Sequence, residues 1–265
     1  ECIVCGWIYD EALGCPEETL DKTYRIALAG NPNTGKSTLF NALTGLKQHT
    51  GNWAGKTVGM AQGRVNYKKS DYLLIDLPGT YSLYSKSTDE EVARNYIVFE
   101  KPHVSLVILD ATSLERNLNL ALQVIEMTSN VIVCVNLIDE AKKRGIEIDE
   151  QRLMRELGVP VLKISARNRT GFTALLDTID RMISGEISTS PLALKYNNEI
   201  EDKIKLLEPN VKKLVGDRFP TRWITLRLLD GDTSLLDEIQ KRMQEEEEPQ
   251  WKSVVKTKGS HLEHF

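Results

Sequence analysis

The sequence predicts an α/β fold, with a mostly parallel sheet of six to seven strands flanked by helices and followed by a small all-helical domain. Two observations support this prediction. Between residues 24 and 184, short apolar runs alternate with segments of helical period, which is the pattern of a parallel sheet covered by helices. After Gly185 no further strand pattern follows, and the remaining amphipathic segments have helical spacing.

The predicted strands are the short apolar runs at residues 25–29, 63–67, 72–76, 105–110, 130–136 and 161–165. Several carry β-branched residues at consecutive positions, as expected of strands that are buried on both faces. The segments of helical period between them are residues 36–43, 88–99, 117–127 and 171–183. Behind residue 185 we expect helices at 198–207, 221–229 and 234–243, broken at Pro209, Pro220 and Gly231.

Composition and charge divide the 265-residue chain into four predicted segments. An acidic N-terminal extension at 1–21 has six Asp or Glu residues and no Lys or Arg, whereas the whole chain has a net charge of −4. We place the α/β domain at 22–187, the helical domain at 188–246 and, at 247–265, a tail that could derive from cloning. No apolar run approaches the ~18 residues of a membrane span, and the overall charge does not suggest nucleic-acid binding.

Residues 30–37, GNPNTGKS, fit the phosphate-binding pattern G-x-x-x-x-G-K-[ST] at every fixed position. Glycine lets the backbone close around a phosphate with successive N–H groups pointing inward, and a following helix adds positive potential at its N-terminus. Lys36 would reach the β- and γ-phosphates, and Ser37 would offer its hydroxyl to Mg²⁺. The residues of this loop predicted to contact a nucleotide are Gly30, Asn31, Asn33, Thr34, Gly35, Lys36, Ser37 and Thr38.

Polar residues that end two later strands predict guanine as the base. Asn136 and Asp139 follow a buried strand, and a carboxylate there accepts from the N1–H and exocyclic amine of guanine, which adenine cannot satisfy. Ser165 and Ala166 follow the next strand and can place a backbone N–H near the guanine carbonyl. Because parallel strands end at one edge of a sheet, these residues fit a single site with the phosphate loop. The predicted nucleotide is GTP, bound and exchanged as GTP or GDP.

The Mg²⁺ side of the site is predicted from two segments. Asp76 and Gly79, in DLPG, end the third predicted strand, where an aspartate on the Mg²⁺ side of the phosphates is expected. The glycine-rich residues 51–59 suit a mobile loop in which Gly55 contacts nucleotide and Thr57 supplies a second hydroxyl to Mg²⁺. The predicted magnesium ligands are Ser37, Thr57 and Asp76.

Hydrolysis is expected to be slow, because Thr80 follows DLPG where Ras-like enzymes carry a water-orienting glutamine. A K⁺ ion beside the β- and γ-phosphates would compensate by neutralising transition-state charge. The Asn33 side chain and backbone carbonyls near Gly51 and Trp53 are its candidate ligands. Asn33 as a turn residue and Trp53 as a packing anchor are the structural alternatives. The predicted catalytic residues are Asn33, Lys36, Thr57 and Gly79.

The four motifs together resemble the nucleotide-binding boxes of the TRAFAC GTPases, which implies the P-loop GTPase fold. The strings GNPNTGKSTLFN at 30–41, GNWAGKTV at 51–58, DLPGTYSL at 76–83, DATSLERNL at 110–118 and RWITLRLLDGD at 222–232 more specifically resemble ferrous iron transport protein B. This resemblance covers roughly residues 23–245. One departure is Leu137, which stands where Ras-like proteins usually carry a lysine and leaves base stacking to other residues.

The resemblance implies a K⁺-stimulated GTPase domain on the cytoplasmic face of the cell membrane, followed by a helical domain that slows nucleotide release. It also implies a membrane domain that carries Fe²⁺ and lies beyond this chain, as the main partner besides GTP and GDP. Self-association stays an open alternative, and no nucleic-acid partner is expected. The carried-over roles are potassium binding for Asn33, magnesium binding for Ser37 and Thr57, and guanine contacts for Asn136, Asp139, Ser165 and Ala166.

The N-terminal extension departs from that family. Its CIVCGWIYD sequence at 2–10 resembles the first knuckle of a rubredoxin, and Cys15 supplies a third thiol. Cys2, Cys5 and Cys15 could bind Zn²⁺ or Fe with a fourth ligand from elsewhere. A remnant that binds no metal tightly is the alternative, because a C-x-x-C pair without its partner pair is a weak signal.

Two other functions fit parts of the sequence. A potassium-dependent GTPase that acts on RNA or tRNA would share the Asn-containing phosphate loop, but the sequence lacks the basic, aromatic-rich appendage that RNA binding favours. An electron-transfer or metal module would make residues 1–21 the functional centre, with the GTPase as its regulator.

Overall fold

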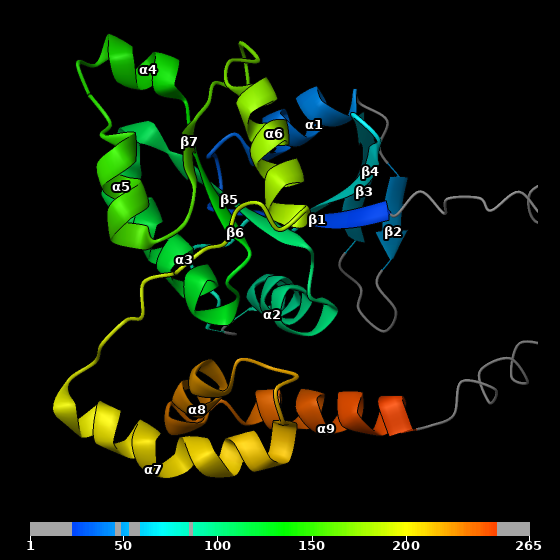
Figure 1. Ribbon diagram of the computed structural model, residues 1–265, viewed down its shortest axis with the longest axis vertical. Helices are drawn as coiled ribbons and strands as arrows, with labels where there is room; N and C mark the ends of the chain where they lie inside the picture. Colours follow the sequence, from blue (N-terminus) through cyan, green and yellow to red (C-terminus); the bar gives the residue numbers. More distant parts are fainter. Residues whose placement is uncertain (1–22, 46–48, 53–58, 85–86, 248–265) are drawn as a thin grey trace, which may run out of the picture. The chain divides into compact units, whose positions relative to one another are not determined.

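The computed structural model describes residues 23–45, 49–52, 59–84 and 87–247, which belong to two compact units divided between Leu194 and Lys195 (Figure 1). The first unit is a seven-stranded sheet with helices on its faces, and the described part of the second unit consists of helices and their connections. The predicted α/β fold followed by a helical region is confirmed.

The sheet has the strand order β2-β3-β4-β1-β5-β6-β7. Strands β4, β1, β5, β6 and β7 are parallel, whereas β3 is antiparallel to both of its neighbours. All the parallel strands therefore end at one edge, which is where the predicted motifs lie. In chain order the strands are β1 (Thr23–Gly30), β2 (His49–Asn52), β3 (Gly59–Tyr67), β4 (Ser70–Asp76), β5 (Val104–Asp110), β6 (Val131–Asn136) and β7 (Val161–Lys163).

Helices pack on both faces of the sheet. Leu39 and Phe40 of α1 and Leu175 and Ile179 of α6 belong to one buried cluster with side chains of β1, β4, β5 and β6. Helix α3 packs against β5 and β6, whose alternate residues, such as the fully buried Val107, point to the opposite face. The helices of this unit are α1 (Lys36–Thr44), α2 (Thr88–Asn95), α3 (Leu114–Met127), α4 (Ile138–Lys143), α5 (Glu150–Leu157) and α6 (Phe172–Ile183).

The structure adds three elements that were not predicted. Strand β2 is rich in small and polar residues and exists because it pairs with β3. Helices α4 and α5 are short and mainly hydrophilic, and each buries a single residue. The helix predicted at 88–99 begins at Thr88 but changes after Asn95 into a π-helical turn, Tyr96–Glu100. Local sequence pattern was insufficient in these places because tertiary pairing and packing decide the conformation.

The second unit contains α7 (Asn198–Val215), α8 (Thr221–Leu229) and α9 (Thr233–Glu247). The predicted break at Pro209 is wrong, since α7 continues through it. Proline removes one hydrogen bond in a helix interior, but Ile204, Val211 and Val215 lie buried on either side and α7 packs on α8. This packing holds the helix together across Pro209. No helix in the described ranges is long and apolar enough to cross a bilayer.

Candidate nucleotide-binding site

The loop at 30–37 connects β1 to α1 and is held by its own residues and by β5. The Thr34 hydroxyl donates to the Asn31 carbonyl over 2.9 Å, and Asn33 and Gly35 both have left-handed backbones, with φ of 66° and 81°. Gly30 lies close to β5, because a Cβ built on it would be 2.9 Å from the Ile108 carbonyl oxygen. The loop thus turns tightly into the first residues of α1, and the N-terminal N–H groups of a helix attract a phosphate.

Lys36, Ser37 and Asp76 lie together next to this loop. The Lys36 ammonium is paired with one carboxylate oxygen of Asp76, and the Ser37 hydroxyl lies 3.4 Å from the other. Lys36 is nearly buried, and Asp76 ends β4 next to β1. A hydroxyl and a carboxylate are hard oxygen donors of the kind that Mg²⁺ prefers, so this donor set fits that ion.

The segment after Asp76 is fastened to β1 and to the phosphate loop. The backbone N–H of Leu77 donates to the Leu28 carbonyl over 3.0 Å, and that of Thr80 donates to the Gly30 carbonyl over 3.3 Å. A Cβ built on Gly79 would lie 3.6 Å from Pro32. These contacts place Gly79 directly beside the phosphate loop.

Asn136 ties two loops of the site together. Its Nδ2 donates to the Thr34 carbonyl and its Oδ1 accepts from the Ala166 backbone N–H, each over 2.9 Å. The side chain is fully buried, and a Cβ on Gly35 would lie only 2.4 Å from its Nδ2. Both ends of the amide are therefore engaged by the protein, so Asn136 positions the phosphate loop against the loop that contains Ala166.

The Asp139 carboxylate is held by two neutral donors. The Ser165 hydroxyl donates to its Oδ1 over 3.0 Å, and Asn168 Nδ2 donates to its Oδ2 over 3.4 Å. Leu137, with φ of 62°, turns the chain from β6 into α4 and sets Asp139 in the first turn of that helix. A carboxylate can accept about four hydrogen bonds, so two donors orient it while it keeps capacity for a ligand.

Sequence reasoning missed Asn168, which lies two residues beyond Ala166. It is a polar residue in the loop that follows the strand with the Ser165-Ala166 motif, and this position was the only signal available for it. The predicted residues Gly30, Asn33, Gly35, Lys36, Ser37, Asp76, Gly79, Asn136, Asp139, Ser165 and Ala166 all lie at this edge of the sheet. Thr38 is exposed in the first turn of α1, and Gly51 lies in β2 opposite Met60.

Several predictions fall on residues outside the described ranges, namely Trp53, Gly55, Thr57, Cys2, Cys5 and Cys15. Among the residues that the structure does describe, no three His, Cys, Asp or Glu side chains gather in an arrangement that could hold a metal. Cys134 is fully buried in β6, and this burial raises the pKa of its thiol to about 12. The Cys134 thiol therefore stays protonated at neutral pH.

Two family models match the chain. The model described as ferrous iron transport protein B matches residues 24–179, and the model described as the FeoB cytosolic helical domain matches residues 196–264. The two matches correspond to the α/β unit and to the helical unit.

Curated relatives of the chain are Fe(2+) transporters. The chain is 38% identical over 216 residues to Fe(2+) transporter FeoB of Escherichia coli strain K12, covering 80% of this chain and 27% of that protein. It is 36% identical over 213 residues to the protein of the same name from Staphylococcus aureus strain COL, covering 80% of this chain and 32% of that protein. The chain thus spans about a third or less of the length of these relatives.

Solved structures of FeoB cytosolic domains have the same fold. The apo form from T. maritima matches with a TM-score of 0.75 at 38% identity, covering 83% of this chain and 86% of that one. The domain from L. pneumophila matches with a TM-score of 0.74 at 32% identity, covering 85% and 90%. The fold is therefore that of the P-loop GTPases with an added helical domain. The chain belongs to the ferrous iron transport protein B family and carries its G domain and its cytosolic helical domain.

Proposed function

We propose that this chain binds GTP with Mg²⁺ and hydrolyses it to GDP and phosphate, as the cytosolic module of a ferrous iron transporter. The observation that carries the proposal is the convergence of the phosphate loop, Asp76 and Asp139 on one edge of the sheet. Solved T. maritima relatives in GDP and GMPPNP forms support nucleotide binding, and the relatives named Fe(2+) transporter support the biological context.

At the phosphate end, Lys36 exchanges its contact with Asp76 for the β- and γ-phosphate oxygens. Both partners of this ion pair are nearly buried, so each needs a replacement partner when the pair separates. The phosphates would be the new partner of Lys36, and Asp76 together with Ser37 would hold Mg²⁺. Bound Mg²⁺ would neutralise charge on the phosphate oxygens. The backbone of Gly79, which lies beside Pro32, is the group that we assign to the γ-phosphate.

At the base end, Asp139 selects guanine. Its carboxylate is held by Ser165 and Asn168 and accepts from the N1–H and exocyclic amine of the base. Asn136 contributes by holding the phosphate loop and Ala166 in register, so its role is to position both halves of the site. This arrangement supports GTP over ATP by a polar discrimination that can reach several orders of magnitude.

The intrinsic hydrolysis rate is proposed to be slow and stimulated by K⁺. Thr80 follows Gly79, and its short hydroxyl cannot orient a water molecule as a glutamine does. The Asn33 carboxamide oxygen, on a loop residue with a left-handed backbone, is the ligand we assign to K⁺. Bound K⁺ would neutralise charge that develops between the β- and γ-phosphates. The carbonyls of Gly51 and Trp53 and the hydroxyl of Thr57 stay predictions.

The test compares GTP and ATP hydrolysis by the chain in KCl and in NaCl at matched ionic strength, with Asn33→Ala alongside. We expect hydrolysis of GTP only, with on the order of 10-fold stimulation by K⁺ that is lost in Asn33→Ala. Equal rates in both salts would overturn the potassium role, and equal rates for GTP and ATP would overturn the assignment of the base.

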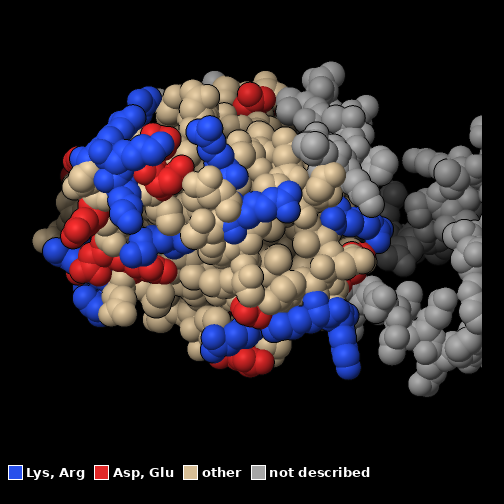
Figure 2. All heavy atoms as spheres, turned by 90° about the horizontal axis from the view of Figure 1, so that it is seen from above, with Lys and Arg blue, Asp and Glu red and all other residues tan. Residues whose placement is uncertain are grey.

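The transport context makes the membrane domain of the full-length protein the main partner, with the helical unit slowing nucleotide release. Figure 2 shows cationic side chains in separate groups on the face that it draws, without one continuous basic band. This distribution and the family match do not favour the RNA-associated alternative. Self-association and metal binding by Cys2, Cys5 and Cys15 stay predictions that no described residue bears on.

A further inference from the structure

The segment 77–84 follows Asp76 and is attached to the rest of the molecule at both ends. Its first half is fastened to the phosphate side, through Leu77 to β1 and through Thr80 to Gly30. Its second half contacts α3, a helix that comes much later in the sequence. Gly79 lies within the first attachment, between Leu77 and Thr80, and the second attachment follows directly after Thr80. A shift of the second half therefore reaches Gly79 through Thr80.

One face of α3 provides the second attachment. Arg116 and Gln123 are seven residues apart, which places them on the same face of the helix about two turns from each other. The Arg116 guanidinium lies 4.7 Å from the centre of the Tyr81 ring, and the Leu83 backbone N–H donates to Gln123 Oε1 over 2.7 Å. The face thus holds the segment by one side-chain contact and one backbone contact.

The hydrogen bond between Gln123 and Leu83 is buried, and it uses only half of the glutamine. Gln123 is 4% exposed and Leu83 is 1% exposed. Within the described part of the chain, Gln123 Nε2 is buried without a hydrogen-bond acceptor. The orientation of the amide is fixed by chemistry, because the Leu83 N–H needs an acceptor and so must face the oxygen. A buried N–H group without an acceptor costs free energy, which an apolar side chain of the same size would avoid.

We propose that Gln123 is a positioning residue for GTP hydrolysis, which holds segment 77–84, and through it Gly79, in a nucleotide-dependent arrangement. In the structure Gln123 Oε1 accepts from the Leu83 backbone N–H. When the γ-phosphate draws Gly79 toward it, the segment shifts, and Nε2 gains a backbone carbonyl of the same segment as its acceptor. This inference rests on the proposed GTPase function.

The kinetic test uses two variants of nearly equal size. Gln123→Met keeps the volume and removes both polar atoms, whereas Gln123→Glu keeps an oxygen that accepts from Leu83. We expect Gln123→Met to lower kcat for GTP about 10-fold, with GDP affinity within about twofold of the wild-type chain. Gln123→Glu should not recover the lost kcat, because its second oxygen can only accept and cannot donate to the backbone carbonyl as Nε2 does. Gln151→Met, at an exposed position of α5, is the matched control and should leave kcat unchanged.

A wild-type kcat in Gln123→Met would overturn the proposal. So would a loss of GDP affinity equal to the loss in kcat, since that result indicates collapse of the whole site. If the wild-type chain itself hydrolyses no GTP and binds no GDP, then the proposed function fails, and this outcome is distinct because it precedes any variant.

A second measurement needs no variant and decides the question if Gln123→Met does not fold. Hydrogen exchange at the Leu83 amide is followed in the wild-type chain with GDP and with a non-hydrolysable GTP analogue. We expect the protection of this amide to differ about 10-fold between the two states, because the segment that carries it shifts relative to Gln123. Equal protection in both states would overturn the nucleotide-dependent role.

Discussion

The two edges of the sheet hold their polar side chains in different ways. At the edge where β1, β4 and β6 end, backbone groups do most of the holding. Asn136 is fixed between the Thr34 carbonyl and the Ala166 N–H, and the segment after Asp76 is fixed by Leu77 and Thr80. Two groups are held by side chains instead, namely the Lys36–Asp76 ion pair and the Asp139 carboxylate, which accepts from Ser165 and Asn168. The proposed function gives each of these charged groups a ligand.

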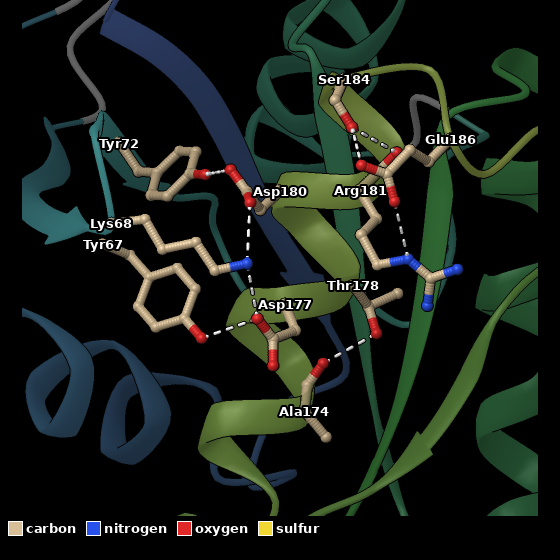
Figure 3. Close-up of polar contacts among 10 residues, drawn as sticks. All are labelled: Tyr67, Lys68, Tyr72, Ala174, Asp177, Thr178, Asp180, Arg181, Ser184 and Glu186. Carbon is tan, nitrogen blue, oxygen red and sulfur yellow. Dashed lines mark hydrogen bonds and ion pairs between the residues drawn. The ribbon is translucent and has the colours of Figure 1, made fainter.

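At the opposite edge, side chains pair with one another between the β3–β4 hairpin and α6 (Figure 3). The Tyr67 hydroxyl donates to Asp177 over 2.8 Å, and the Tyr72 hydroxyl donates to Asp180 over 2.9 Å. The Lys68 ammonium lies 2.8 Å from Asp177 and 3.0 Å from Asp180. Hydrogen bonds to these carboxylates raise the pKa of Lys68, and burial, with a hydrogen bond to Asp180, raises the pKa of Tyr72 to about 12.

This difference separates a binding edge from a structural edge. At the binding edge Asp139 keeps acceptor capacity for a ligand. At the other edge Tyr67, Lys68 and Tyr72 already donate to the two carboxylates of α6. Substitutions that remove the same chemical group should therefore affect nucleotide binding at one edge and stability at the other.

The largest expected effect comes from Asp139→Asn. An asparagine there cannot accept from both N–H groups of guanine, so we expect GDP affinity to fall on the order of 100-fold or more. Xanthine nucleotides carry a carbonyl in place of the exocyclic amine, and Asn Nδ2 can donate to it. Titration calorimetry measures the fall in GDP affinity and the accompanying rise in XDP affinity. The matched control is Asp177→Asn at the other edge, which should leave GDP affinity unchanged. A similar loss in both variants would contradict the separation of the edges.

A smaller effect is expected from Tyr72→Phe. Tyr72 is fully buried, and its hydroxyl donates to Asp180, so the variant should lower the free energy of unfolding by about 1 kcal/mol. Urea unfolding measures this change. GTP hydrolysis at a temperature where both proteins are folded should be the same for Tyr72→Phe and the wild-type chain. If hydrolysis falls together with stability, then the two edges are coupled and the comparison is wrong.

The sequence was sufficient for the parts of the fold that are encoded locally. Helix α8 has the predicted bounds Thr221–Leu229, and the phosphate loop lies between a strand and a helix as predicted. Strand β2 was missed because its residues form a strand only by pairing with β3, and the continuation of α7 through Pro209 depends on packing. Both depend on residues distant in the chain.

The candidate site likewise has residues that the local sequence predicts and contacts that it does not. Motif residues such as Lys36, Asp76 and Asp139 could be predicted because their spacing follows the ends of strands. The contacts that hold the site's segments could not be predicted, since Gln123 contacts Leu83 across 40 residues and Asn168 contacts Asp139 across 29. Such contacts depend on how α3 and the loop after β7 are placed by the folded core, which no local pattern encodes.

The smallest expected effect tests the structural edge by pH. Hydrogen bonds from Lys68 and then Tyr67 hold the pKa of Asp177 below its usual value of 3.8. A carboxylate whose pKa is lower in the folded state stabilises the fold above the unfolded pKa and loses this contribution as the pH falls. Both Lys68 and Asp177 are about half exposed, so the contribution is small and screened by salt. Between about pH 5 and pH 3, the urea midpoint of the wild-type chain should therefore fall more than that of Asp177→Asn. Parallel falls would mean that the Asp177 contacts contribute nothing measurable, which leaves the contacts of Asp180 with Tyr72 and Lys68 to hold the hairpin to α6.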